Sequence, residues 1–254
     1  MARKLAALYD IHGNLPALSA VLAELDEVQP DLIVVGGDVV SGPLPEQTLA
    51  RLDQLDGRVR WIRGNGDREV VSSFDGQSLP ATLSERGRER QQWVAGRLSL
   101  VQREFLAQLP ERMTLPLEGV GRVLFCHATP HSDEEIFTPL SEQDRLAAIF
   151  AAVEEPLVVC GHTHIQFERQ VGPVRVVNAS SVGMPYADRP GAYWLLLTPT
   201  GPEFRYTPYD PQAAAQEIRA GGDPQAEEFA RDNVLRVPTA AEAAEVLEQM
   251  AQHR

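Results

Sequence analysis

Short apolar runs alternate with amphipathic stretches in the first quarter of the chain. Three of the runs have strand length, and the two stretches between them place apolar side chains at helical spacing. In chain order these predicted elements are residues 4–9, 15–28, 31–35, 45–56 and 58–62. The order strand, helix, strand, helix, strand predicts an α/β unit with a parallel sheet.

The rest of the chain is richer in strands. Residues 81–109 are polar and predict helix, with a buried stripe formed by Trp93, Leu98, Val101, Phe105 and Leu109. The pattern then predicts a hairpin at residues 112–126, a helix at 141–153, a strand at 157–160 and four short strands between 166 and 209. We therefore expect an α/β protein in which two sheets pack face to face, with helices outside them.

The end of the chain differs in composition from what precedes it. Residues 211–254 are rich in alanine, glutamate and glutamine, and they predict two or three small helices interrupted at residues 221–224 and at Pro238. They contain no motif of a functional site. We predict one domain over residues 1–210 and a helical C-terminal tail, residues 211–254, that packs on the same domain.

Composition and charge limit the possible partners. The 254 residues are 43% hydrophobic and 23% charged, so the chain is able to bury a substantial core without disulfides. A net charge of −13 disfavours binding to nucleic acid, although a local cationic site for a small phosphate ligand remains open. The apolar run before Tyr9 is too short for a signal peptide, and no window approaches a membrane span. We expect a cytoplasmic protein with reduced, buried Cys126 and Cys160, and its oligomeric state stays open.

Five short polar motifs each follow a predicted strand. They are Asp10-Ile11-His12, Gly36-Gly37-Asp38, Gly64-Asn65-Gly66-Asp67, Cys126-His127 and Gly161-His162-Thr163-His164. Ligands bind at the strand ends of an α/β sheet because the loops converge there. Histidine, aspartate and asparagine together suit a divalent metal such as Mn²⁺, Fe or Zn²⁺. The set is larger than one open catalytic metal takes, and it suits two metals about 3.5–4 Å apart that share a carboxylate.

Each motif alone has a plainer interpretation. The Gly-Gly-Asp and Gly-Asn-Gly-Asp runs are typical of turns, since glycine and asparagine accept positive φ at little cost. His162 and His164 would point to opposite faces of a strand, so they share a site only if the backbone bends behind Gly161. The five motifs together, in this order, are what indicate a metal site.

In that order the motifs resemble the signature of the calcineurin-like metallophosphoesterase superfamily, which is D-x-H, G-D, G-N-[H/C]-[D/E], H and G-H-x-H. The resemblance covers roughly residues 4–210 and is similar to the small bacterial and archaeal phosphodiesterase branch. It implies a four-layer αββα sandwich of two mixed sheets flanked by helices. This agrees with the two packed sheets that the strand pattern predicts.

The resemblance also implies two divalent metal ions, with Mn²⁺ as the first expectation and Fe, Zn, Ni or Co as alternatives. One metal would be held by Asp10, His12, Asp38 and His164, and the other by Asp38, Asn65, His127 and His162, with Asp38 as the bridge. A hydroxide between the metals would be the nucleophile, and Asp38, Asn65 and His127 are the residues we expect to be catalytic. Asn65 would be presented by a tight turn that Gly64 permits.

Gly66 departs from the family pattern, which has His or Cys at this position and uses the His to assist the leaving group. A missing general acid typically forfeits about 10²–10⁴ in rate for a poor leaving group. Either the substrate has a good leaving group, as in a dinucleoside polyphosphate, a pyrophosphate link or an activated diester, or another residue supplies the proton. His131 is the candidate for that second role, and its alternative is a solvent-exposed loop residue.

Weaker candidates surround the motifs. Asp67 would either orient neighbouring ligands or act as a turn residue, and Arg68 would either hold a phosphate oxygen or pair with Glu69. Asn14 matches an extended form of the first family motif and equally suits a helix cap. Residues 178–185, NASSVGMP, resemble a family segment that closes the sheet beside the metals, and we expect a structural role for them.

We therefore expect a dinuclear-metal-dependent phosphoesterase that hydrolyses phosphodiester or phosphoanhydride bonds in a small phosphorylated or nucleotide substrate. The alternatives are a phosphomonoesterase, or a binding scaffold that keeps this fold without catalysis. The scaffold alternative predicts eroded ligand positions, whereas all seven positions match here.

Overall fold

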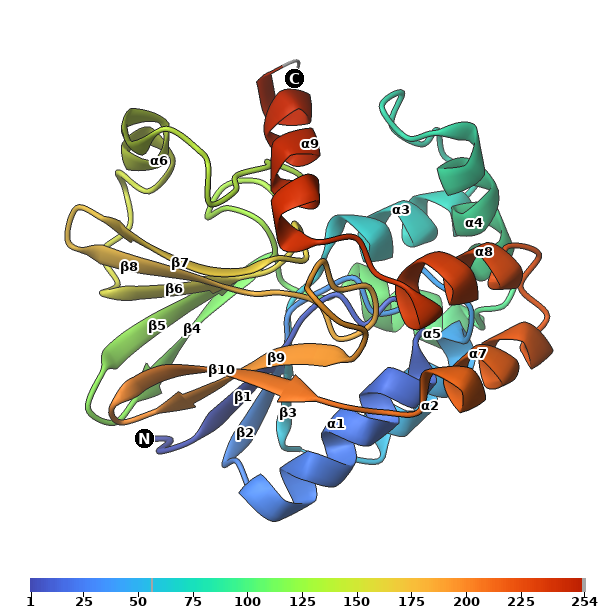
Figure 1. Ribbon diagram of the computed structural model, residues 1–254, viewed down its shortest axis with the longest axis horizontal. Helices are drawn as coiled ribbons and strands as arrows, with labels where there is room; N and C mark the ends of the chain where they lie inside the picture. The colour runs from blue at the N-terminus through green and yellow to red at the C-terminus, as the bar shows by residue number, and fades with distance from the viewer. Residues whose placement is uncertain (56, 253–254) are drawn as a thin grey trace.

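The computed structural model describes residues 1–55 and 57–252, and two five-stranded sheets packed face to face form its centre (Figure 1). The first sheet has the order β10-β9-β1-β2-β3. Its strands are β1 (Leu5–Leu8), β2 (Leu32–Val35), β3 (Val59–Trp61), β9 (Ala192–Thr198) and β10 (Gly201–Thr207). The sheet is mixed, because β1, β2 and β3 run parallel whereas β9 is antiparallel to both β1 and β10.

The second sheet has the order β4-β5-β6-β8-β7. Its strands are β4 (Arg112–Leu117), β5 (Gly121–Cys126), β6 (Leu157–Cys160), β7 (Gln166–Val171) and β8 (Val174–Ala179). Here β5, β6 and β8 run parallel, and the two edge strands are antiparallel to their neighbours. The second sheet is therefore also mixed.

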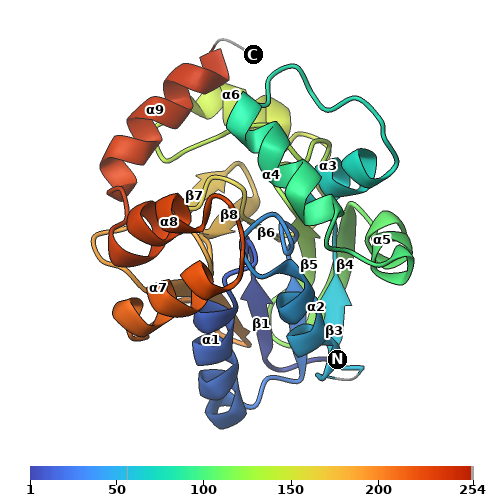
Figure 2. The same cartoon turned by 90° about the vertical axis from the view of Figure 1, so that its right-hand side faces the viewer.

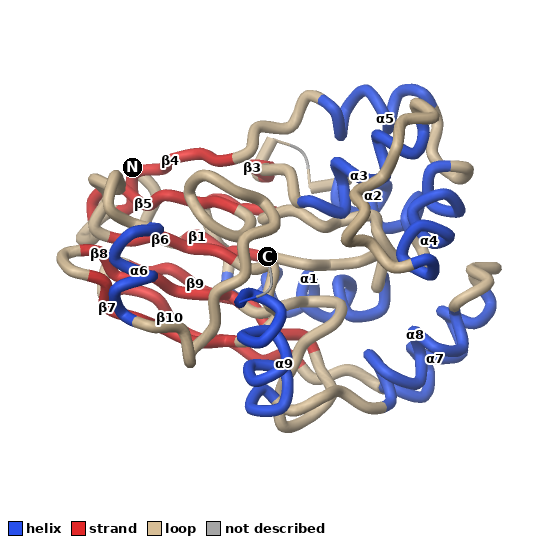
Figure 3. The backbone as a smooth tube through the Cα atoms, turned by 90° about the horizontal axis from the view of Figure 1, so that it is seen from above, coloured by secondary structure: helices blue, strands red, loops and turns tan. Residues whose placement is uncertain are grey.

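Helices surround the two sheets and extend beyond one end of them. They are α1 (Leu15–Val28), α2 (Pro45–Asp53), α3 (Asn65–Phe74), α4 (Glu85–Ala95), α5 (Leu100–Ala107), α6 (Gln143–Ile149), α7 (Pro211–Ala220), α8 (Ala226–Ala230), the π-helix η1 (Arg231–Leu235) and α9 (Ala240–Gln252). Helix α1 packs on the first sheet, and α6 and α9 lie over the second (Figures 1 and 2). In Figure 3 the strands fill one half of the molecule, and α3, α4, α5, α7 and α8 gather in the other half.

Strand β1 illustrates why the sheets stack in this way. Leu5 and Ala7 belong to the cluster between the two sheets, whereas Ala6 and Leu8 belong to the cluster beneath α1. Side chains alternate between the two faces of a strand, and both faces of β1 are covered. The strand is therefore apolar throughout, which is typical of a parallel strand buried on both sides. The predicted αββα arrangement of two mixed sheets is confirmed.

Most predicted elements occur close to their expected positions. Helix α1 begins after Asn14, whose side-chain oxygen accepts a hydrogen bond from the backbone N–H of Ala17 at 3.2 Å, so the predicted cap is confirmed. The hairpin at residues 112–126 is confirmed as β4 and β5. Cys126 and Cys160 are buried, free thiols at the ends of β5 and β6, as expected.

The prediction for residues 65–109 is wrong in two respects. The Gly-Asn-Gly-Asp run predicted a turn, but residues 65–74 form helix α3, and the predicted helical stretch 81–109 divides into α4 and α5. The predicted stripe is confirmed at Leu98 and Leu109, which are buried, but it is wrong at Val101, which is 74% exposed, and at Phe105, which is 38% exposed. The other buried residues of this stretch are Gln91, Val94, Ala95 and Leu106. A break at Gly96–Ser99 rotates α5 relative to α4, so no single helical stripe spans both.

The C-terminal helices pack in two places. Helices α7, α8 and η1 form an apolar cluster with Leu44, which precedes α2, and α9 places Ala243 and Ala244 against the second sheet. The division at residue 210 stays a prediction. Within the described part of the chain, no helix is both long and apolar enough to cross a membrane.

Candidate metal centre

The predicted ligands follow the ends of β1, β2, β3, β5 and β6, and the two packed sheets bring these ends together. Asp10 Oδ1 lies 3.2 Å from His164 Nε2, 3.7 Å from His12 Nε2 and 3.8 Å from His127 Nε2. Two groups of metal-binding side chains result, one of Asp10, His12 and His164 and one of Asp10, Asp38 and His127. All five of these residues are buried.

Asp10 belongs to both groups, and Asp38, a member of the second group, also faces the first. Its Oδ2 is 3.8 Å from His12 Nε2, and its Oδ1 is 3.6 Å from His127 Nε2, so each carboxylate oxygen faces a different histidine. Its Oδ1 also accepts a hydrogen bond of 2.7 Å from the backbone N–H of Gly66. The carboxylate is thereby fixed between the two groups.

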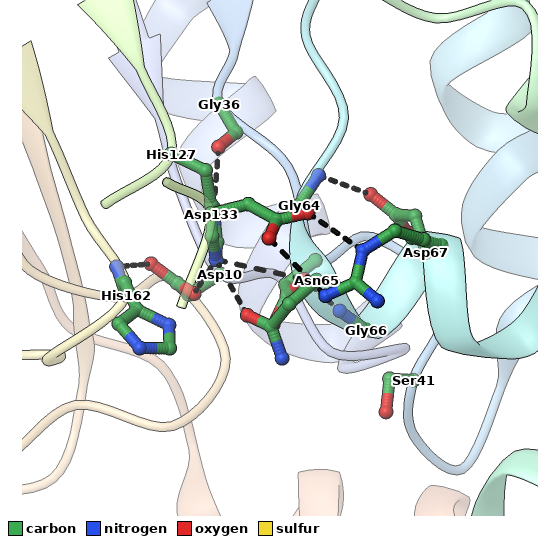
Figure 4. A network of polar contacts seen from close by, with 12 residues as sticks. Asp10, Gly36, Ser41, Gly64, Asn65, Gly66, Asp67, His127, Asp133 and His162 are labelled. Carbon is green, nitrogen blue, oxygen red and sulfur yellow. Dashed lines mark hydrogen bonds and ion pairs between the residues drawn. The ribbon is translucent and has the colours of Figure 1, made fainter. Parts of the chain in front are cut away.

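Asn65 and His162 complete the constellation. Figure 4 shows Asp10, Asn65, His127 and His162 meeting in one region from four separate segments. His127 Nε2 lies 3.2 Å from Asn65 Oδ1, and the rings of His127 and His162 are 5.3 Å apart. With the amide of Asn65 turned round, its nitrogen faces His162 Nδ1 at 3.1 Å and His127 Nε2 at 3.2 Å. Two imidazole nitrogens thus face the amide of Asn65. A hydrogen-bond donor or a cation placed between these atoms would satisfy the nitrogen lone pairs.

Backbone carbonyls select which ring nitrogen of each histidine faces the centre. The Nδ1 atoms of His12, His127 and His164 lie 3.0, 2.9 and 2.8 Å from the carbonyl oxygens of Ser41, Gly36 and Met184. A proton on Nδ1 satisfies each carbonyl and leaves Nε2 with its lone pair toward the centre. His162 is reversed, because its Nε2 lies 3.2 Å from the carbonyl of Glu134 and its Nδ1 is left to face Asn65.

Five candidate ligands have a left-handed backbone. Their φ values are 53° for Asp10, 49° for His12, 52° for Asp38, 66° for His162 and 57° for His164. Non-glycine residues rarely adopt this conformation, which costs about 1–3 kcal/mol each and clusters at functional sites. The bend in Gly161-His162-Thr163-His164 that the sequence required is therefore present, and the strain indicates that the fold holds these side chains in place for a function.

Burial and charge shift the pKa values of the clustered groups in different directions. Burial lowers the pKa of His12 and that of His162 to about 3 each. Burial also acts to lower the pKa of His127, but Asp38 and Asp10 outweigh it and raise that pKa to about 8. Burial raises the pKa of Asp38 to about 7 against the opposing charge of His127. Two imidazoles at least are therefore neutral at pH 7, which is the form that binds a metal.

The donor set fits divalent cations. Asp10 Oδ1 is buried and has no hydrogen-bond partner among the described residues, although three imidazole Nε2 atoms surround it. A buried carboxylate oxygen in that position is costly unless a proton or a cation satisfies it. Imidazole nitrogen with carboxylate and amide oxygen is a ligand mixture suited to Mn²⁺, Fe and Zn²⁺.

Gly64 has a different role from the predicted one. Asn65 is the first residue of α3, and Gly64 has an extended backbone with φ −96°, so no positive-φ turn requires a glycine. A Cβ at position 64 would lie 2.1 Å from Asp38 Oδ1 and 2.5 Å from the Asp38 backbone nitrogen. Glycine is needed there because the β3–α3 connection passes directly against Asp38.

Asp67 connects the loops that carry the ligands. Its carboxylate accepts hydrogen bonds from the backbone N–H groups of Val39 at 2.9 Å, Val40 at 3.3 Å and Gly64 at 3.2 Å. The first two follow Asp38 and the third precedes Asn65, so Asp67 holds both ligand-bearing segments to each other. This contact pattern corresponds to the orienting role rather than to that of a simple turn residue.

The other two weaker candidates are engaged elsewhere. Arg68 pairs with Asp133, at 2.9 Å from Nε to Oδ2, and with Glu134, and these partners differ from the predicted Glu69. His131 is 58% exposed in its side chain and pairs with Glu135 at 2.9 Å. It nevertheless lines, together with His127, a cleft of about 170 Å³.

The structure adds contacts made by residues outside the five motifs. Ser181 Oγ donates to the Asp10 carbonyl at 2.6 Å, and Ser180 Oγ donates to the His164 carbonyl at 2.7 Å, so the segment after β8 holds two strained backbones. Gln91 donates to Glu69 at 2.7 Å and accepts from Ser41 at 3.0 Å behind the site. The sequence signal for the two serines was the position of NASSVGMP directly after a strand, and Gln91 had none.

Imidazole, carboxylate and amide side chains gathered at the strand ends of two packed mixed sheets form a donor set suited to a metal-dependent hydrolase. Residues 4–201 match the calcineurin-like phosphoesterase superfamily domain, and the chain belongs to this family of metal-dependent phosphoester hydrolases. The resemblance inferred from the motifs is thereby confirmed.

Individual relatives are more distant. Phosphodiesterase YfcE of Escherichia coli K12 is 24% identical in an alignment 202 residues long, which covers 76% of this chain and 86% of YfcE. A hypothetical protein from Pyrococcus horikoshii OT3 has a similar structure, with a TM-score of 0.78, 21% identity and coverage of 93% of this chain and 99% of that one. A metallophosphoesterase from Sphaerobacter thermophilus has a TM-score of 0.68, 24% identity and coverage of 91% and 98%. These two structural alignments cover more than nine-tenths of this chain, so they include residues beyond the end of the family match at residue 201. At least part of the C-terminal helices therefore belongs to the shared fold.

Proposed function

We propose that the protein hydrolyses phosphodiester or phosphoanhydride bonds, including those of dinucleoside polyphosphates, with two divalent cations, Mn²⁺ first among them. The observation that carries this proposal is a complete set of ligand side chains beside a position, Gly66, that has no side chain to protonate a leaving group. A substrate that releases a stable anion needs no such proton.

The two cations would be held by overlapping sets of residues. Asp10, His12, Asp38 and His164 form one set, and Asp38, Asn65, His127 and His162 form the other. The opposed oxygens of Asp38, each directed at a different histidine, support its assignment as the shared ligand. Cations bound there activate water and neutralise charge on the phosphoryl oxygens.

The protein's own groups prepare the site before any cation arrives. The carbonyls of Ser41, Gly36 and Met184 keep three imidazoles in one tautomer. The backbone N–H of Gly66 and the close approach of Gly64 fix Asp38. These contacts lower the reorganisation needed on binding, and that is how a preorganised site stabilises charge.

Hydrolysis of three substrates by metal-stripped protein reloaded with Mn²⁺ tests the proposal. We expect diadenosine tetraphosphate or bis(p-nitrophenyl) phosphate to be cleaved at least tenfold faster than p-nitrophenyl phosphate. His127→Ala serves as the blank, since it removes an expected ligand. A faster monoester would contradict the leaving-group argument and make His131, which lines a cleft with His127, the next residue to replace. Tight binding of two metals without any hydrolysis would instead support the scaffold alternative.

A further inference from the structure

A second cleft opens beside the metal centre, on the side of His12. Its volume is about 260 Å³. Three segments line it: the loops of the centre, helix α4, and the helices α8 and η1 of the C-terminal tail. The lining residues on which the inference rests are His12, Arg86, Arg90, Gln225, Glu228 and Asn233.

Most of this cleft is built by the chain outside the five motifs. Helix α4 contributes two arginines, and the C-terminal helices, which lie beyond the family match at residue 201, contribute the facing wall. Asn233 lies in a π-helix, a rare wide turn that is often found at functional sites. The cleft is therefore a feature of this chain that the metal ligands alone do not explain.

Arg90 is fixed in position at the cleft. Its Nε and Nη2 both donate to Gln225 Oε1, at 3.1 and 2.9 Å, and its guanidinium lies 5.5 Å from the ring centre of Phe229. Its Nη1 is 3.5 Å from Asp223 Oδ2, a carboxylate oxygen that accepts no hydrogen bond from the described part of the chain. The side chain is only 15% exposed. Arg90 is thus held by the amide of Gln225 and lies 3.5 Å from the carboxylate of Asp223, which leaves N–H groups of Nη1 without a hydrogen bond to that carboxylate.

Arg86 stands at the rim of the same cleft and forms an ion pair with Glu228. Its side chain is 63% exposed, so it is able to move toward a ligand. Outside the candidate metal centre, the described charged lining is Arg86, Arg90 and Glu228, and Asp223 lies 3.5 Å from Arg90, in a chain whose net charge is −13. Two arginines gathered at one cleft of an acidic protein offer a local site for an anionic ligand, and arginine is suited to phosphate because its donors form a planar fork.

We propose that this cleft binds a second phosphoryl group of the substrate, next to the one that is cleaved, through Arg86 and Arg90. Glu228 competes for Arg86 and weakens that binding until the ligand displaces it. This inference rests on the proposed function, and it narrows the substrate class to polyphosphate-linked compounds rather than simple diesters.

Two ligands that differ by one phosphoryl group test the proposal directly. AMP and the non-hydrolysable α,β-methylene analogue of ADP are titrated calorimetrically into the Mn²⁺-loaded protein. We expect the analogue to bind about tenfold more tightly than AMP, which corresponds to ~1.4 kcal/mol. Arg86→Gln should remove most of that preference, and Glu228→Gln should increase it. If the ion pair between Arg86 and Glu228 had only a structural role, replacing either partner would not change the preference in opposite directions.

Controls separate the cleft from general charge effects. Arg219→Gln removes the same charge from the same tail, where Arg219 pairs with Glu227 outside the cleft, and should leave both affinities unchanged. Arg90→Lys keeps the charge but loses the planar fork, and it should weaken binding of the analogue more than that of AMP. Melting temperatures of all variants show whether each one is folded.

Hydrolysis distinguishes failure of this inference from failure of the proposed function. Bis(p-nitrophenyl) phosphate has one phosphoryl group, so Arg86→Gln and Glu228→Gln should both retain kcat/KM for it within about twofold. For diadenosine tetraphosphate, the KM should rise in Arg86→Gln and fall in Glu228→Gln. If no substrate is cleaved, the proposed function fails while the calorimetric preference still decides on the cleft. Equal affinity for AMP and the analogue, or the same change for both in Arg86→Gln, would overturn the cleft assignment.

Discussion

Asp38 is the residue on which most local constraints act. It has a left-handed backbone, it accepts a hydrogen bond from the Gly66 N–H, and the connection through Gly64 presses against it. Each constraint limits where its two carboxylate oxygens lie. The positions of glycines around it are therefore as important to the site as the ligands themselves.

Gly64→Ala should damage the site through Asp38. The added methyl would lie 2.1 Å from Asp38 Oδ1, so the carboxylate or the backbone must shift. We expect the free energy of unfolding to fall by about 1–3 kcal/mol, as for overpacking in a core, and Mn²⁺ affinity to fall at least tenfold. Urea denaturation and calorimetric titration measure the two effects. Gly66→Ala is the matched control, because its added methyl would lie 3.0 Å, not 2.1 Å, from the same Asp38 Oδ1. Equal losses of stability and of Mn²⁺ affinity in both variants would contradict this account.

At this scale the sequence predicted candidate ligand side chains but not how they are held. Motif order singled out Asp10, His12, Asn65 and the other candidate ligands, since their chemistry is in the side chain. The carbonyls of Gly36, Ser41 and Met184 have no side-chain signature, although they set the histidine tautomers. The sequence also assigned the wrong reason to Gly64, because a close approach between distant segments is invisible in a local pattern.

Among the elements, α3 connects the site to the loop after β5. Its Arg68 pairs with Asp133 through two hydrogen bonds, of 2.9 and 3.1 Å, and with Glu134. The same helix supplies Asn65, and the loop supplies the Glu134 carbonyl that contacts His162. The ion pairs therefore fix the two candidate ligands Asn65 and His162 relative to each other.

Arg68→Gln should lower stability in a pH-dependent manner. Burial acts to raise the pKa of Asp133, but the hydrogen bonds and charge of Arg68 outweigh it and hold that pKa below its ordinary value. A lowered folded-state pKa gives a stabilisation that is complete above the ordinary aspartate pKa and is lost as the pH falls through the folded-state value. We expect a loss of about 1 kcal/mol at pH 7 that shrinks toward pH 3, measured by urea denaturation at both values.

The control for this variant is Arg97→Gln. Arg97 pairs with Glu46, and both side chains are more than a third exposed, so removing it should change stability by less than about 0.5 kcal/mol at either pH. A loss in Arg68→Gln that does not vary with pH would mean that packing, and not the ion pair, accounts for the effect.

The elements that the sequence predicted best are those buried on two faces. β1, β2 and β6 are continuous apolar runs, and such runs end sharply at the polar motifs. Helix α3 was missed because Gly-Asn-Gly-Asp is typical of a turn, whereas Asp67 caps this helix by accepting from the Gly64 N–H. The stripe over residues 81–109 failed at Val101 and Phe105, because a single helical period was applied across a break.

At the scale of the whole molecule, the candidate metal centre joins the two sheets. Asp10, His12, Asp38 and Asn65 follow strands of the first sheet, and His127, His162 and His164 follow strands of the second. The tail closes over the same end through α8 and η1. Occupancy of the centre should therefore affect the stability of the entire fold.

Removal of metal should lower the melting temperature. At a hundredfold excess over its Kd, a bound metal contributes ~2.7 kcal/mol, and each kcal/mol shifts the melting temperature of a chain this size by about 2–4 °C. We expect chelation to lower it by about 5–10 °C in calorimetric scans. His127→Ala should respond much less to the chelator, and an unchanged melting temperature of the wild-type protein would refute metal binding at this interface of the sheets.

The left-handed backbones at five candidate ligands have an evolutionary consequence. Glycine adopts this conformation without strain, whereas each aspartate or histidine there raises the energy of the fold by about 1 kcal/mol or more. A duplicated gene released from selection for hydrolysis would therefore gain stability from its first glycine substitutions at Asp38 or His162. Loss of hydrolytic activity would then accompany a gain in folding stability. Inactive descendants of such an enzyme should therefore arise easily and persist as well-folded proteins.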